Sequence, residues 1–440
     1  MWRMQKRYSN CMQTIRTQAE TVRNAQKELA GLTDDQKRHI LLALCDQLEA
    51  DRQQIFTANR KDVEAAEREG VAKPLVKRLK FDEAKLHDCV LGIRDVASLE
   101  DPTGKVLLRR ELDEGLILVK ESCPIGVIGM IFESRPDALV QIVSLCLKSG
   151  NGIILKGGSE AALTNRALAE SIARAVSSCG MNPQWMCLLE TREEVSRMLE
   201  LDDLIDLLIP RGSNQFVRWI MDHSRIPVLG HADGICHVYV DRDADLDRAL
   251  HICVDAKCQY PAACNAAETF LVHEAAAPSF LPMLASALQE NQVEIRGDKA
   301  VRSVITCEPA AEEDWGTEYL DLTVSVKVVA SLDEAVSHIH TYGSGHTDAV
   351  ITECRETAEE FLDRVDSAGV YWNCSTRFAD GYRYGLGAEV GISTHKIHAR
   401  GPVGLEGLVS YKWKLYGSGQ AVSDYSGEHG RRFTHRDLSP

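Results

Sequence analysis

Cys264 is the residue best placed for covalent chemistry, within the stretch YPAACNAAE at 260–268. The thiol follows a helix-like segment and precedes the apolar run 269–273, so we expect it in a loop between a helix and a strand. Small alanines beside it would let both a substrate and a cofactor approach, as a nucleophilic thiol requires. The alternative is one more packed cysteine, because the chain holds 14 of them.

Two glycine-containing turns are candidates for binding a phosphorylated ligand. Lys156-Gly-Gly-Ser159 ends one apolar run and begins a helix-like segment, and Arg211-Gly212-Ser213-Asn214 repeats this arrangement one unit later. Backbone N–H groups at the start of a helix, with a cation nearby, suit ribose or phosphate groups. Each turn alone fits a solvated lysine or an N-cap equally well. Together they favour a nucleotide site.

Cations and histidines supply the remaining candidates. Arg377, Arg383, Lys396 and Arg400 lie within the loop-rich segment 371–402, where arginine would bind a carboxylate or phosphate if it faced a cleft. Ordinary surface charge is the alternative. The histidines of 338–346 and 395–398 have no carboxylate or cysteine at zinc spacing, so we predict no metal site.

An α/β scaffold is expected to position these residues. Residues 1–100 are predicted to be helical, with a capping box at Thr33–Gln36, and 104–121 resembles a hairpin that turns at 113–115. Apolar runs then alternate with helix-like segments, which is typical of a doubly wound parallel sheet. The runs are 125–131, 152–155, 185–189, 204–209 and 226–229, and the helix-like segments lie near 137–149, 160–178, 192–200 and 214–222.

A second α/β unit is predicted from about Gly234 to residue 400, followed by a strand at 408–415 and a polar tail. No Gly-x-Gly-x-x-Gly fingerprint follows the first strand, so the common dinucleotide motif is missing. Tightly packed domains of this kind favour a site in the cleft between them.

Length and charge exclude several classes of protein. At 440 residues the chain is long enough for two or three domains, and its net charge of −15, from 50 basic and 65 acidic residues, disfavours nucleic-acid binding. It contains no run of 18 apolar residues, so we predict no membrane span. The cysteines are scattered without a Cys-x-x-Cys pair. We therefore expect a soluble cytoplasmic enzyme.

Several long blocks then identify the chain by resemblance. They resemble the gamma-glutamyl phosphate reductases, a family within the aldehyde dehydrogenase superfamily, over roughly residues 20–420. The most specific blocks are IPRGSNQFVRWIMDHSRIPVLGHADGICHVYVD at 209–241, YPAACNAAETFLVH at 260–273, VASLDEAVSHIHTYGSGHTDAVI at 329–351 and the segment 371–413, which includes GPVGLEGLVSYKW.

The resemblance implies an aldehyde-dehydrogenase-like α/β fold. Its expected parts are an NADP-binding domain at 1–103 and 122–233, a catalytic domain at 234–403, and an oligomerisation element at 104–121 and 404–440. The implied reaction is NADPH-dependent reduction of L-glutamyl 5-phosphate to glutamate 5-semialdehyde, in proline biosynthesis. A small-molecule substrate, a homo-oligomer (dimer or tetramer) and a transient glutamate 5-kinase partner are also implied.

Site roles follow from the resemblance residue by residue. Cys264 stands at the nucleophile that forms a thioester, and its own N–H would help hold the oxyanion. Ser159 occupies a position where NAD-selective relatives often carry glutamate, which favours NADP. The cofactor contacts implied are Lys156 and Ser159 near the adenosine ribose, Gly212 and Ser213 at the pyrophosphate, and Glu318 at the nicotinamide ribose.

The sequence departs from the superfamily pattern at two positions. His231 stands where hydrolytic members carry the glutamate that activates water, so hydrolysis of a thioester should be slow. Ser134 lies opposite the usual oxyanion asparagine. Substrate candidates are therefore Ser134, Arg135, His231, Arg377 and Arg400. A hydrolytic semialdehyde dehydrogenase and an inactive binding protein remain the alternatives.

Overall fold

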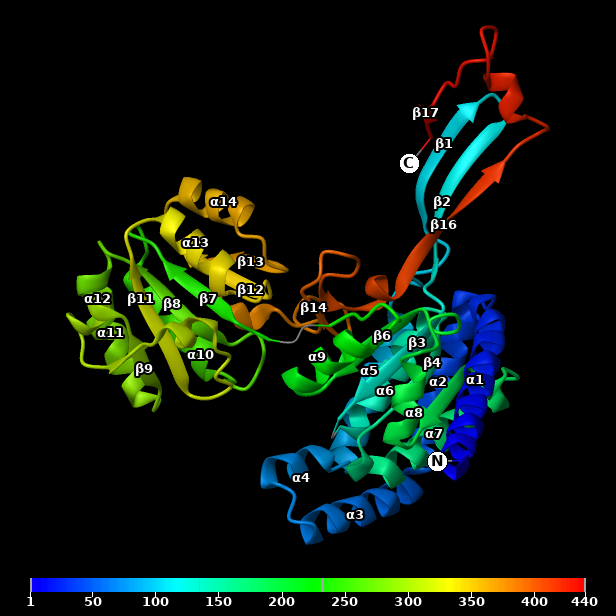
Figure 1. Cartoon of the computed structure of the whole chain (residues 1–440), viewed down its shortest axis with the longest axis horizontal. Coiled ribbons are helices and arrows are strands. Elements are labelled where there is room, and N and C mark those ends of the chain that lie inside the picture. The colour runs from blue at the N-terminus through cyan, green and yellow to red at the C-terminus, as the bar shows by residue number, and fades with distance from the viewer. Residues whose placement is uncertain (1, 134, 231–232, 439–440) are drawn as a thin grey trace.

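We analysed a computed structural model that describes residues 2–133, 135–230 and 233–438 (Figure 1). Five helices open the chain, as the sequence predicts: α1 (Trp2–Ala30), α2 (Asp34–Ala50), α3 (Arg52–Arg68), α4 (Lys73–Leu79) and α5 (Glu83–Ser98). The predicted capping box is present, because Thr33 Oγ1 accepts from the Gln36 N–H while the Gln36 side chain accepts from the Thr33 N–H. None of the described helices is long and apolar enough to cross a lipid bilayer.

The first sheet is parallel and doubly wound, which confirms the predicted fold class. Its order is β5-β4-β3-β6. In β3, the side chains of Ile128 and Met130 pack into the apolar core on one face, and those of Val127 and Ile131 pack into the core on the other face. Both faces are therefore covered by helices. The elements are β3 (Val127–Phe132), α6 (Pro136–Lys148), β4 (Gly152–Lys156), α7 (Ala162–Ser178), β5 (Met186–Leu189), α8 (Arg192–Met198), β6 (Leu207–Arg211) and α9 (Asn214–His223).

The run 226–229 was predicted as a strand, and this prediction is wrong. The structure has only an isolated parallel bridge there, between Leu208 and Val228. The backbone of Leu208 donates to Pro227 O at 2.9 Å and accepts from Leu229 N at 2.8 Å. Because Pro227 has no N–H, so short a run cannot extend the ladder further.

A second parallel sheet, with more strands than the first, forms the second α/β unit, with the order β10-β9-β11-β8-β7-β12-β13. Two apolar clusters cover its faces, one with Phe270 and Val326 and the other with Leu271 and Val350. The strands are β7 (Cys236–Val240), β8 (Ala267–His273), β9 (Glu294–Gly297), β10 (Glu308–Pro309), β11 (Thr323–Val329), β12 (Thr347–Ile351) and β13 (Gly369–Trp372). The helices are α10 (Leu246–Cys258), α11 (Ala277–Glu290), α12 (Lys299–Arg302), α13 (Leu332–Tyr342) and α14 (Arg355–Arg364).

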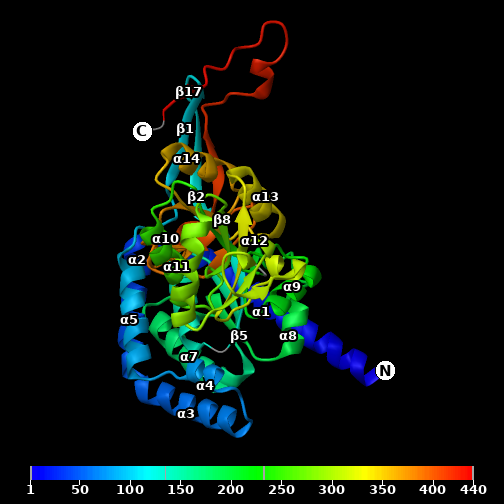
Figure 2. The same cartoon turned by 90° about the vertical axis from the view of Figure 1, so that its left-hand side faces the viewer.

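A third sheet projects away from both units (Figures 1 and 2). The hairpin of β1 (Val106–Asp113) and β2 (Leu116–Pro124) turns at Glu114-Gly115, where Gly115 has a φ of 71°. On either side lie β16 (Val409–Tyr416) and β17 (Arg436–Asp437), giving the order β16-β2-β1-β17. The other short elements are β14 (Gly391–Ser393), β15 (Gly401–Val403) and 3₁₀ turns at 159–161, 183–185, 312–316, 376–378, 405–408 and 422–425.

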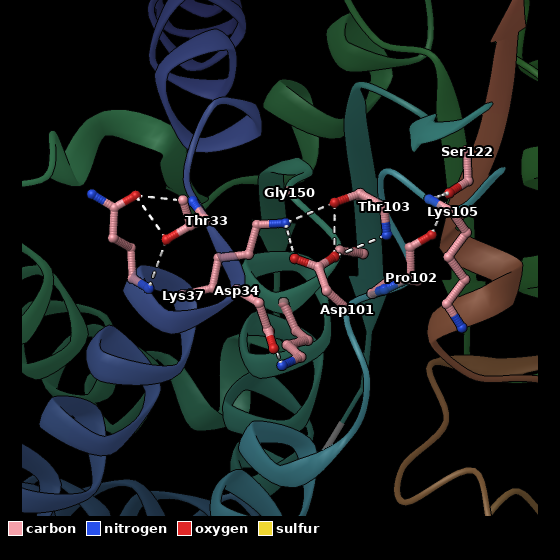
Figure 3. A network of polar contacts seen from close by, with 12 residues as sticks. Thr33, Asp34, Lys37, Asp101, Pro102, Thr103, Lys105, Ser122 and Gly150 are labelled. Atoms are coloured by element: carbon pink, nitrogen blue, oxygen red, sulfur yellow. Dashed lines mark hydrogen bonds and ion pairs between the residues drawn. The ribbon is translucent and has the colours of Figure 1, made fainter. Parts of the chain in front are cut away.

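A buried lysine ties the first unit to the base of this projecting sheet (Figure 3). Lys37 of α2 is fully buried, and its Nζ lies 2.8 Å from Asp101 Oδ2 and 3.0 Å from Thr103 Oγ1. Beyond Thr103 the chain enters β1, where Lys105 N donates to Ser122 Oγ at 2.9 Å. The ammonium therefore holds the segment through which the chain leaves the first unit.

Replacing Lys37 with methionine should lower the free energy of unfolding by about 3 kcal/mol, since it leaves the Asp101 carboxylate without its buried cation. Urea unfolding followed by fluorescence measures this. Lys85→Met is the matched control, because Lys85 is 44% exposed in its ion pair with Asp137 and should change stability by less than about 1 kcal/mol. Equal losses in both variants would contradict the proposed role of Lys37.

Candidate active site

Cys264 lies in the loop between α10 and β8, as predicted, and is half-buried. The segment that enters the second unit passes directly against its backbone. A Cβ at Gly234 would lie 2.2 Å from Cys264 O and 2.6 Å from its Cα, so only glycine fits there. Cys236 Sγ donates to Cys264 O at 3.3 Å. These contacts fix the backbone that carries the thiol.

A buried ion pair closes the base of the same loop. Lys257 Nζ, near the end of α10, lies 2.6 Å from Glu268 Oε2, near the start of β8, and both side chains are fully buried. Burial raises the pKa of Glu268, and the ammonium of Lys257 opposes that rise. Truncating either partner would leave a buried charge, so the pair holds the two ends of the loop together.

A later segment covers the other side of the loop. The Asn265 side-chain amide donates to Ala379 O at 2.8 Å, and Thr376 Oγ1 donates to Asn265 O at 2.7 Å. The neighbouring Arg377 is buried, and its Nε donates to Gln259 Oε1 at 2.9 Å. The predicted residues Cys264 and Arg377 are therefore brought together, although 112 positions separate them in the numbering.

The surroundings of the loop disfavour the thiolate form of Cys264. Burial, followed by the carboxylates of Glu318 and Glu389, raises the pKa of Cys264 to about 12, while Arg377 acts to lower it. Burial in turn lowers the pKa of Arg377. A further positive charge or a hydrogen-bond donor from a bound ligand would be needed to favour the thiolate.

The carboxyl ends of three strands of the first sheet meet at one edge. The register pairs Ile131 of β3 with Lys156 of β4 and Phe132 with Arg211 of β6. Lys156 is buried and its Nζ donates to Gly157 O, while Ser159 is exposed at the start of the following 3₁₀ turn. In open α/β sheets, ligands bind at such an edge.

The turn at the start of α9 joins this edge to the second unit. A Cβ at Gly212 would lie 3.0 Å from the Glu133 carboxyl group and from the Phe216 ring. Ser213 is the N-cap residue, yet its side chain makes no cap hydrogen bond. Asn214 Nδ2, directly after the Gly212-Ser213 turn, donates to Glu318 Oε2. After burial, the Glu318 carboxylate is also the strongest cause of the raised pKa of Cys264. Glu318 is therefore linked to both the turn and the thiol.

Arg211 was named from the sequence only as part of the 211–214 turn, and its link to Cys264 was not predicted. It is half-buried, and no hydrogen bond or ion pair engages its guanidinium among the described residues. Burial lowers the pKa of Arg211, and the charges that act on it most strongly are those of Glu389, Arg135 and Cys264. Its place as the last residue of β6, directly before Gly212-Ser213, is the signal that could have identified it.

Arg400 contacts a carboxylate outside the Cys264 loop. It forms an ion pair with Asp366 at 3.0 Å, and Lys396 contacts the same carboxylate. Ser134 and His231 lie outside the described residues. No cluster of three metal-binding side chains occurs in the part of the chain that the structure describes.

Comparisons with a protein-family model and with individual relatives agree with each other. Residues 8–308 match the aldehyde dehydrogenase family. Curated proteins named gamma-glutamyl phosphate reductase are 59% identical in Pelotomaculum thermopropionicum and 56% identical in a Cyanothece strain, and each alignment covers 96% of this chain and 97% of the relative. The crystal structure of gamma-glutamyl phosphate reductase from Thermotoga maritima is 39% identical, with a TM-score of 0.91 over 92% of this chain and 99% of that one.

The chain belongs to the aldehyde dehydrogenase family and, within it, to the gamma-glutamyl phosphate reductases. Enzymes of the wider family act on small molecules and use nicotinamide cofactors. The predicted family and fold are thereby confirmed.

Alkylation of Cys264 by iodoacetamide should report its raised pKa. Because only the thiolate reacts, a pKa near 12 predicts a rate that rises about tenfold for each pH unit from 7 to 10. Arg377→Gln should slow the reaction, since Arg377 lowers the pKa of the thiol. Residue-resolved mass spectrometry measures both rates, with Arg355→Gln, on the remote helix α14, as the control. A plateau below pH 9 would contradict the raised pKa.

Proposed function

We propose that this protein reduces L-glutamyl 5-phosphate to L-glutamate 5-semialdehyde with NADPH and releases phosphate, as the second step of proline biosynthesis from glutamate. The observation that carries the proposal is near-full-length identity of 59% to a gamma-glutamyl phosphate reductase, combined with a cysteine loop held between two α/β units. The proposed roles divide among three parts of the chain: cofactor binding in 1–103 and 122–233, the thiol in 234–403, and assembly in 104–121 and 404–440.

Cys264 would supply the nucleophile. After the thiol loses its proton, the sulfur attacks the acyl carbon, a C–S bond forms, and the C–O bond to phosphate breaks to give a thioester and inorganic phosphate. The contacts of Gly234 and Cys236 with the Cys264 backbone hold the loop still, and the Cys264 N–H is the proposed donor to the oxyanion. Bound NADPH supplies the hydride that converts the thioester to the aldehyde.

Two arginines are suited to the phosphoryl group. Arg377 and Arg211 are the cations whose charges couple to that of Cys264, and they come from different units of the fold. Arginine binds phosphate oxygens in a bidentate manner, and a phosphate bound here would satisfy the unpaired guanidinium of Arg211. The same positive charge would favour the thiolate, so substrate binding itself would help to activate the nucleophile.

The residues at the sheet edge fit a pyrophosphate and a phosphorylated ribose. The uncapped N-terminus of α9, with Gly212 and the unengaged Ser213 hydroxyl, offers N–H and O–H donors to an anion. Lys156 would contact the adenosine ribose, Ser159 would tolerate a 2′-phosphate, and Glu318 would meet the nicotinamide ribose. A carboxylate at position 159 would repel that phosphate, so we assign NADP rather than NAD.

A hydrolytic semialdehyde dehydrogenase is the alternative. It needs a general base that activates water against the thioester, and the chain carries His231 rather than glutamate at the expected position. Phosphate, rather than water, is therefore the proposed acyl acceptor in the reverse direction.

Reduction of NADP by glutamate 5-semialdehyde should require inorganic phosphate in the assay. The Cys264→Ala variant should lose at least about a thousandfold in kcat, because the covalent route disappears. Cys258→Ala, a half-buried cysteine at the end of α10, is the matched control and should keep its activity. Turnover that is indifferent to phosphate would support the hydrolytic alternative, and turnover that survives in Cys264→Ala would reject this cysteine.

Ser159→Glu should reverse part of the cofactor preference. A carboxylate a few Å from a 2′-phosphate repels it by about 1–4 kcal/mol, so kcat/KM for NADPH should fall about tenfold or more while that for NADH changes little. Ser177→Glu, exposed in the last turn of α7, is the control. Equal effects on both cofactors would show that position 159 does not face the 2′-position.

The projecting sheet is the proposed assembly element, which gives a dimer or tetramer. It exposes large apolar side chains, among them Leu107, Trp413 and Tyr416, which are each more than half exposed and would be covered by a second copy. A transient complex with a glutamate 5-kinase would protect the labile acyl phosphate from water. The proposed location is the cytoplasm.

A further inference from the structure

A cavity of about 450 Å³ lies between α5, α6 and the segment 380–389. Its lining carries charges of both signs, which distinguishes it from an ordinary apolar crevice between helices. The charged residues that line it are Asp88, Asp95, Arg135, Arg211, Asp380 and Glu389.

Two lining residues, Arg211 and Asp380, connect this cavity with the Cys264 loop. Its Asp380 wall directly follows Ala379, whose carbonyl accepts from the Asn265 side chain next to the thiol. Arg211 lines the cavity, and its charge couples to that of Cys264. A ligand whose reacting carbon met the thiol would therefore extend past Arg211 into this space.

Helix α5 presents one particular face to the cavity. Asp88, Gly92 and Asp95 are spaced at i, i+4 and i+7, so they lie on one side of the helix. Asp88 and Asp95 are exposed, and neither carboxylate has an ion-pair partner among the described residues. Two unneutralised carboxylates on a cavity wall match a ligand that carries a positive charge.

Gly92 has no packing reason to be glycine. It stands in the interior of α5, where glycine costs about 0.5–1 kcal/mol relative to alanine, and its φ is not in the left-handed region. A Cβ added there would meet no atom within 4 Å. The absent side chain instead leaves space in the cavity, as expected where a ligand approaches the helix backbone.

We propose that this cavity binds the α-amino-acid end of the substrate, with Arg135 holding the α-carboxylate and Asp88 and Asp95 the α-ammonium. The assignment rests on the proposed function, because it takes the reacting carbon to be at Cys264. Arg135 begins α6, and no hydrogen bond or ion pair engages its guanidinium among the described residues. It lines the cavity together with Asp88 and Asp95.

The chemistry of the substrate fits this division of the cavity. Three carbon–carbon bonds separate its reacting carbon from its α-carbon, a span of about 4 Å. The phosphoryl group therefore stays with Arg211 and Arg377 at the thiol. The zwitterionic end of the substrate reaches Arg135, Asp88 and Asp95 in the cavity. A zwitterion needs both signs of charge, and the cavity lining supplies both.

Substrate analogues test the two contacts separately. Phosphate-dependent NADP reduction is measured with glutamate 5-semialdehyde, with 5-oxopentanoate, which lacks the α-ammonium, and with 4-aminobutanal, which lacks the α-carboxylate. The wild type should use glutamate 5-semialdehyde with a kcat/KM about tenfold or more above that for either analogue, because each analogue loses one hydrogen bond to a charged group. Asp88→Asn/Asp95→Asn should abolish only the preference over 5-oxopentanoate, and Arg135→Gln only that over 4-aminobutanal.

Gly92→Ala provides a variant that cannot fail by unfolding. It should raise or maintain the melting temperature, because alanine favours the helix, yet raise KM for glutamate 5-semialdehyde about tenfold. Glu83→Gln, exposed on α5 outside the cavity, is the control and should leave all three substrates unchanged. Absence of phosphate-dependent turnover in the wild type would reject the proposed function, whereas unchanged preferences in active variants would reject this cavity alone.

Discussion

The close approach of Gly234 to the backbone of Cys264 is the constraint on which the rest of the site depends. The chain enters the second unit at that glycine, and any side chain there would displace the cysteine loop. The Lys257–Glu268 pair holds the same loop at its base, and Asn265 ties it to the segment 376–379. The thiol is therefore positioned by backbone contacts and buried polar groups, which move little. The guanidinium of Arg211, in contrast, has no hydrogen-bond or ion-pair partner among the residues that the structure describes.

Charge is distributed unevenly around that loop. Burial raises the pKa of Cys264 most, carboxylates from the second unit and from the segment 380–389 raise it further, and Arg377 opposes them. An enzyme that attacks an anionic acyl phosphate gains from this arrangement, because the ligand neutralises the cations only when it is present. The protonated resting thiol would also resist oxidation and alkylation, since both reactions need the thiolate.

The local features of the fold could be predicted from sequence, and the tertiary ones could not. The Thr33 capping box, the 104–121 hairpin and the strand-end turns at Lys156 and Gly212 follow from short patterns, and the structure contains them. The Lys257–Glu268 pair, the coupling of Arg211 to Cys264 and the Arg400–Asp366 pair depend on packing between distant segments. The prediction of a strand at 226–229 was wrong because it was based on apolar character alone and did not consider that Pro227 has no N–H group to donate.

The strand order of the projecting sheet has a consequence for the timing of folding. Its hairpin, β1 and β2, is complete by residue 124, yet its flanking strands β16 and β17 come from 409–416 and 436–437. The hairpin therefore keeps two open strand edges during synthesis until segment 409–437 has emerged from the ribosome. A chain truncated before residue 409 would lack both edge strands and would expose unpaired backbone groups on each side of the hairpin.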